Sequence, residues 1–125
     1  MILIYGGAYQ GKLEYTKNNY DIKTVSECTS GAEPDFSCDA IHGLDQFVLE
    51  CVRSGRDATE YFREHESELQ DTVIIANDIS SGIVPMDKDV RAAREMNGRL
   101  LIYLASKADE VIRVFCGIGD RKSVV

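Results

Sequence analysis

A short apolar run at residues 2–5 leads directly into a glycine-rich stretch, and this junction limits the folds open to the chain. A continuous β-branched and aromatic run that ends at glycines predicts a buried strand. Gly6 to Leu13 then read G-G-A-Y-Q-G-K-L, which matches the phosphate-binding signature G-x-x-x-x-G-K-[ST] at every position except the last. With a helix expected from about residue 11 to residue 18, the pattern predicts a strand, a ligand-binding loop and a helix in succession.

Each residue type in this loop has a separate chemical role. Glycines let the backbone aim successive N–H groups at phosphate oxygens, and the following helix adds its positive dipole end. Lys12 supplies a mobile cation, whereas Leu13 stands where a Ser or Thr hydroxyl would bind Mg²⁺. The candidate nucleotide-binding residues are Gly6, Gly7, Ala8, Gln10, Gly11, Lys12 and Leu13. Nucleotide binding survives the leucine more readily than phosphoryl transfer does, and the alternative is a glycine-rich turn that binds nothing.

The composition excludes several classes of protein. The 125 residues suffice for one domain, which we expect to span residues 1–125. A net charge of −7 argues against nucleic acid or an anionic membrane as the main partner, because phosphate-rich surfaces require clustered Lys and Arg. No apolar run reaches the roughly eighteen residues of a membrane span, and no basic segment precedes residues 2–5, so a cytoplasmic protein is expected. Four cysteines without C-x-x-C spacing predict reduced thiols.

Strands and helices alternate along the rest of the chain. Strands are expected at residues 22–25, 72–76 and 110–116, and helices at 42–53, 58–69 and 87–108, the last with Asp87 as its cap. Irregular segments are expected at residues 29–35 and 77–86, with a polar tail at 117–125 in which Arg121 and Lys122 are solvated. This alternation predicts an α/β domain of three layers with a mostly parallel sheet.

A second block, far from the loop, carries an ordered pattern. It comprises Asn77, Gly82, Ile83, Val84 and Pro85, then Gly98, Arg99 and Leu100, then Ala108, Asp109, Glu110 and Val111. The pattern resembles the adenosylcobinamide kinase/adenosylcobinamide-phosphate guanylyltransferase family, bifunctional P-loop enzymes of cobalamin biosynthesis. The loop at residues 6–13 resembles the opening of the same family. The resemblance implies one P-loop NTPase-like kinase domain.

The resemblance also implies an activity and a site. The γ-phosphoryl group of ATP or GTP would pass to a hydroxyl of adenosylcobinamide, a corrinoid. Lys12, Asp39 and Asp78 would be catalytic, Asn77 would join the nucleotide site, and Asp39 would organise Mg²⁺. Alternatively, Asp39 is a cap or turn residue, while Asn77 and Asp78 brace their loop. The resemblance further implies a homo-oligomer.

Departures from the family pattern leave other functions open. Leu13 and Gln10 replace serines of the family loop, Asp78 replaces Glu, and Ser80 replaces Gly. The segment that carries the guanylylated histidine of the family is missing, so guanylyl transfer is not expected, and His42 is interpreted as a surface or helix-start residue. The chain could therefore be a weakened or inactive relative that binds nucleotide or corrinoid, or acts as a partner subunit. A ligand-free structural domain is the third alternative.

Overall fold

The computed structural model describes residues 1–6, 11–77, 87–115 and 118–123. Its elements in chain order are β1 (Ile2–Gly6), α1 (Lys12–Asn19), β2 (Val25–Glu27), η1 (Thr29–Gly31), β3 (Ala40–His42), α2 (Leu44–Ser54), α3 (Ala58–Glu64), η2 (Glu66–Glu68), β4 (Val73–Asn77), α4 (Lys88–Lys107), β5 (Glu110–Phe115) and β6 (Ile118–Ser123).

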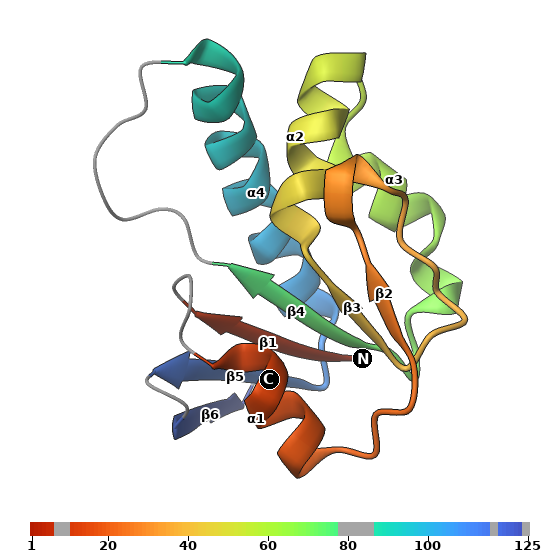
Figure 1. Ribbon diagram of the computed structural model, residues 1–125, viewed down its shortest axis with the longest axis vertical. Coiled ribbons are helices and arrows are strands. Elements are labelled where there is room, and N and C mark those ends of the chain that lie inside the picture. Colours follow the sequence, from red (N-terminus) through yellow and green to blue (C-terminus); the bar gives the residue numbers. More distant parts are fainter. Residues whose placement is uncertain (7–10, 78–86, 116–117, 124–125) are drawn as a thin grey trace.

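One sheet runs through the molecule in the order β2-β3-β4-β1-β5-β6. The first five of these strands are mutually parallel, and β6 pairs antiparallel with β5 at the edge. Strand β1 is therefore central, flanked by β4 and β5 (Figure 1). Parallel strands place their carboxyl ends at one edge of the sheet, and Figure 1 shows α1 following β1 from that edge.

Alternate side chains of the strands face two separate apolar layers. Leu3 and Ile74, which are register partners, lie in a core cluster with the buried faces of α2, α3 and α4. Ile4 and Ile75 point the other way, into a smaller cluster against which α1 packs. Helices thus cover both faces of the sheet (Figure 1). The predicted fold class, a three-layer α/β domain of the P-loop type with a mostly parallel sheet, is confirmed.

The structure corrects several boundaries. The strand predicted at residues 22–25 is Val25–Glu27, and a strand at Ala40–His42 precedes the helix predicted from residue 42. That helix begins at Leu44, because Gly43 adopts a left-handed φ of 78° and turns the chain between the strand and the helix. The helix predicted at 58–69 ends at Glu64 and continues as the short η2. The polar tail contains β6, an antiparallel edge strand that carries no apolar run.

Helix α4 begins at its predicted cap. The Asp87 side chain accepts a hydrogen bond of 2.8 Å from the Asp89 backbone N–H, which confirms the cap. No helix within the described part of the chain is long and apolar enough to cross a bilayer. Cys28, Cys38 and Cys51 are free thiols, as predicted, and burial raises the pKa of Cys28 to about 12, with the charges of Glu27 and Asp45 adding to the effect.

Candidate functional site

The glycine loop and the second sequence block meet at the carboxyl edge of the sheet. Gly6, the last residue of β1, is the register partner of Asn77, the last residue of β4. The Asn97 side chain of α4, which is 2% exposed, donates a hydrogen bond of 3.0 Å from Nδ2 to the Asn77 carbonyl oxygen. This bond fixes the end of β4 against α4. Two segments about seventy residues apart in sequence therefore flank one point on the edge where open α/β sheets bind ligands.

Gly6 is required by the close approach of β5. A Cβ at this position would clash with the Val114 carbonyl oxygen and would lie 3.6 Å from Cδ of Lys12. The absent side chain thus lets β1 and β5 pair tightly and leaves room for the stem of the lysine. This requirement explains Gly6 without any ligand.

Lys12 is a buried cation at the start of α1. Gly11 caps the helix in the left-handed region with a φ of 77°, and Lys12 is only 5% exposed. Burial lowers the pKa of the Lys12 ammonium, and the negative charge of Asp45 partly offsets this effect. A desolvated cation beside the first N–H groups of a helix favours a bound anion, because the anion offsets the cost of burying the charge.

Leu13 acts as a packing residue in the observed fold. Its side chain is half-buried and packs against the smaller core cluster, beside Ile4 and Ile75. The next hydroxyl on this helix, Thr16, is fully buried, and its Oγ1 donates a 2.7 Å hydrogen bond to the Lys12 carbonyl oxygen. Neither side chain supplies the oxygen that the phosphate-loop signature normally offers to Mg²⁺.

Asp39 lies at the opposite edge of the sheet from Lys12. It directly precedes β3, whose first residue Ala40 pairs with the first residue of β4. Its Oδ2 accepts hydrogen bonds from the backbone N–H groups of Lys23 and Thr24, at 2.9 Å and 3.2 Å, and these bonds lower the pKa of the carboxyl group. This position, at the amino end of β3, favours the alternative that Asp39 is a turn residue over a catalytic or Mg²⁺-organising role.

The structure brings other polar residues to the carboxyl edge. His42 ends β3, and its Nδ1 lies 2.8 Å from Oε2 of Glu27, which ends β2. Asp45 lies in the first turn of α2 and is close enough to affect the pKa of Lys12. Sequence reasoning missed Asp45, and it placed His42 at a helix start because β3 was not recognised. The signal that could have found them is Gly43, which interrupts the pattern between an apolar pair and a helix.

The remaining predicted site residues are Gly7, Ala8, Gln10 and Asp78, and they lie outside the described residues. The described residues include no cluster of three or more His, Cys, Asp or Glu side chains that could hold a metal ion. A Mg²⁺ ion bound with a nucleotide would therefore take most of its ligands from phosphate and water, because Leu13 offers no oxygen and Asp39 lies at the other ends of the strands.

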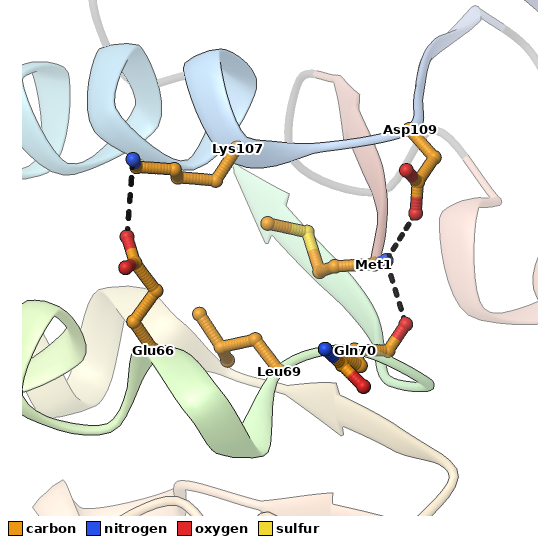
Figure 2. A pocket seen from close by; sticks show the side chains of 6 residues that line it. All are labelled: Met1, Glu66, Leu69, Gln70, Lys107 and Asp109. Carbon is orange, nitrogen blue, oxygen red and sulfur yellow. Dashed lines mark hydrogen bonds and ion pairs between the residues drawn. The ribbon is translucent and has the colours of Figure 1, made fainter.

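A cavity of about 390 Å³ lies at the amino ends of the strands, and Figure 2 shows the residues that line it, among them Met1, Lys107 and Asp109. Its charged groups are already paired with one another. The Met1 ammonium donates hydrogen bonds to Oδ2 of Asp109 at 2.7 Å and to the Gln70 carbonyl oxygen at 2.8 Å. Glu66 lies 3.2 Å from Nζ of Lys107 across the same cavity. We therefore interpret the cavity as a place where separate chain segments meet and their charged groups neutralise one another.

The sheet order, the central strand and the helix that follows it define an α/β domain of the P-loop type. The family model of cobinamide kinase / cobinamide phosphate guanyltransferase matches residues 44–121, more than half of the chain, and the chain belongs to this family. No curated protein sequence matches the chain. The family comprises enzymes of cobalamin biosynthesis that use nucleoside triphosphates and cobinamide substrates. The family match begins after β3 and does not cover the loop of residues 6–13. That loop is a candidate nucleotide-binding site on the basis of its own sequence and of the described geometry of its two ends.

Proposed function

We propose that the protein is a kinase that binds ATP or GTP at residues 6–13 and transfers the γ-phosphoryl group to a hydroxyl of adenosylcobinamide. Lys12 contacts the phosphates, Asn77 joins the nucleotide site, and Asp78 is catalytic, as the family resemblance implies. Asp39 has no part in this proposal. Guanylyl transfer is not part of it either, because the family histidine that carries the guanylyl group has no counterpart in the chain.

The observation that carries the proposal is the buried position of Lys12. Its side chain is 5% exposed at the start of α1, and its Cδ lies 3.6 Å from where a Cβ would stand on Gly6, the register partner of Asn77. Burial lowers the pKa of the Lys12 ammonium and the charge of Asp45 offsets this effect only in part, so a bound phosphate chain would further favour the charged form. Membership of the family suggests the acceptor, which is adenosylcobinamide.

The direct test incubates the protein with adenosylcobinamide and Mg-ATP or Mg-GTP and follows the phosphate ester by mass spectrometry. The expected result is product formation that Lys12→Ala abolishes. Lys17→Ala is the matched control, because Lys17 lies on the same helix with an exposed side chain and should leave the rate unchanged. Absence of product across a wide pH range would overturn the proposal.

A weakened relative that only binds nucleotide or corrinoid, or serves as a partner subunit, is the second candidate, and Leu13 favours it. Under this alternative, Leu13→Ser should sharply raise turnover by restoring a hydroxyl for Mg²⁺. The half-buried packing of Leu13 means that the variant also loses stability, so its turnover should be measured well below its melting temperature. Wild-type turnover near about 1–100 s⁻¹, typical of kinases, would contradict this alternative.

We also propose, from the resemblance alone, that the protein assembles as a homo-oligomer. Its mass in solution, measured by light scattering over a range of concentrations, should exceed that of one 13.9 kDa chain. A mass equal to one chain at all concentrations would contradict this proposal.

A further inference from the structure

We propose that His42, oriented by Glu27, accepts the proton of the hydroxyl that becomes phosphorylated. The inference rests on the proposed kinase activity and extends it to residues that no sequence pattern assigned. It starts from a side-chain pair at the carboxyl ends of two neighbouring strands. His42 and Glu27 are register partners in β3 and β2, and Nδ1 lies 2.8 Å from Oε2.

The pair fixes the hydrogen-bonding roles of the imidazole ring. An ionised carboxylate only accepts hydrogen bonds, so Nδ1 of His42 carries the proton that Glu27 receives. In the neutral ring, Nε2 is then an acceptor. A histidine held in this tautomer has the form that a general base requires.

The backbone around the pair holds it in place. The Cys28 N–H donates a 3.0 Å hydrogen bond to the His42 carbonyl oxygen, which joins the ends of the two strands. Gly43 then turns the chain with a φ of 78°, and a Cβ at that position would lie 3.8 Å from Oε2 of Glu27. The pair thus sits on rigid sheet backbone at a tight strand-to-helix turn, where a side chain can be positioned precisely.

The pair shares its edge of the sheet with the proposed phosphate site. Strands β1, β4 and β3 are parallel neighbours, so the end of β3 and the end of β1 lie on the same side. Asp45, three residues after His42, is close enough to Lys12 to affect its pKa, and it acts on buried Cys28 beside the pair as well. The groups that the structure places next to His42 are Glu27 and Cys28 from the β2 side, and Asp45 follows in the first turn of α2.

A purely structural role explains the pair less well. The side chains of His42 and Glu27 are 33% and 47% exposed, and ion pairs this accessible to water contribute little to stability, about 0–1 kcal/mol. The exposure that weakens a structural role is what a substrate hydroxyl needs to reach Nε2.

The proposed step is balanced. The acceptor hydroxyl oxygen forms a bond to the γ-phosphorus while its proton passes to Nε2 of His42. The bond between the γ-phosphorus and the bridging oxygen breaks, its electron pair stays on that oxygen, and the nucleoside diphosphate leaves. Glu27 stabilises the resulting imidazolium and therefore acts as a positioning residue, whereas His42 contacts the reacting hydroxyl.

The test compares the transfer kinetics of His42→Gln with those of His65→Gln. His65 is the matched control: it is 32% exposed, its Nδ1 likewise has an acceptor, the Tyr61 carbonyl oxygen, and it lies at the end of α3. His42→Gln should lower kcat for transfer by about 100-fold or more while nucleotide affinity stays unchanged. His65→Gln should match the wild type, and Glu27→Gln should lower kcat by a smaller factor than His42→Gln.

A further readout separates catalysis from structure. Free imidazole should restore transfer in His42→Ala and should have no effect on the wild-type protein. Unchanged kcat in His42→Gln would overturn the role of His42 while leaving the kinase proposal standing. Absence of transfer by the wild-type protein would overturn both the kinase proposal and the role of His42.

Discussion

At the scale of single residues, Lys12 is the clearest conflict between stability and function. Its pKa is lowered by burial, so at neutral pH the folded chain holds a charge that its surroundings disfavour relative to water. The unfolded chain binds this proton more tightly, so the cost is present at neutral pH and disappears as pH rises through the lowered pKa toward 10.5. Such a residue is expected where function, rather than stability, selects it.

Lys12→Met should therefore raise the melting temperature at pH 7. A rise of a few degrees is expected, equivalent to about 1 kcal/mol, because methionine fills a similar volume without a charge. Differential scanning calorimetry measures the shift, with Lys17→Met as the exposed control on the same helix. A lower melting temperature for Lys12→Met than for the control would contradict the interpretation of Lys12 as a buried, costly cation.

For Asp39, in contrast, we predict a role in stability and no role in catalysis. Because its carboxylate receives backbone hydrogen bonds from Lys23 and Thr24 at the amino edge, Asp39→Asn should leave transfer and nucleotide affinity unchanged. The pKa of Asp39 is lowered in the fold, so its stabilising effect is present above the ordinary pKa of 3.8 and is lost as pH falls through the lowered value. The melting temperature of the variant should thus fall below that of the wild type at pH 7 and converge with it in acid. Loss of transfer in Asp39→Asn would restore the original assignment.

At the scale of elements, Gly6 in the central strand β1 and Gly98 in the long helix α4 should respond in opposite ways to substitution by alanine. Gly6→Ala should destabilise the fold by about 1–3 kcal/mol, because its Cβ clashes with the Val114 carbonyl oxygen between β1 and β5. Gly98→Ala should stabilise it by about 0.5–1 kcal/mol, because Gly98 lies inside α4 and a Cβ there meets nothing within 4 Å. Urea unfolding of both variants measures the two effects, and shifts of the same sign would contradict the packing described here.

The sequence predicted the elements that bury long apolar patterns. The central strands at residues 2–5 and 72–76 and the helix from Asp87 follow from continuous or helical apolar spacing. Strands β2 and β3 contain three residues each, too few for any period to appear. Because β3 was not recognised, Asp39 was not seen to precede a strand whose three residues span about 10 Å, and His42 was not seen to end that strand.

At the scale of the whole molecule, strand order brings separate sequence blocks to the same edge of the sheet. The parallel pairing of β1 with β4 brings Gly6 next to Asn77, and the next strand brings His42 to the same edge. The loop and the second block were predictable because each has a sequence pattern, and the sheet rule places both at the carboxyl edge. Asp45, Asn97 and the Glu27–His42 pair were not predictable, because their proximity depends on the observed order of the strands.

The central claim, nucleotide binding through Lys12, is tested most directly by calorimetric titration with ATP and GTP, each with and without Mg²⁺. The wild-type protein should bind at least one nucleotide with a Kd between about 1 μM and 1 mM, the usual range of enzyme–substrate affinity. Lys12→Ala should weaken binding at least about tenfold, the effect of losing one charged phosphate contact, while Lys17→Ala binds as the wild type does. Absence of binding by the wild-type protein, or equal affinities for Lys12→Ala and Lys17→Ala, would contradict the account.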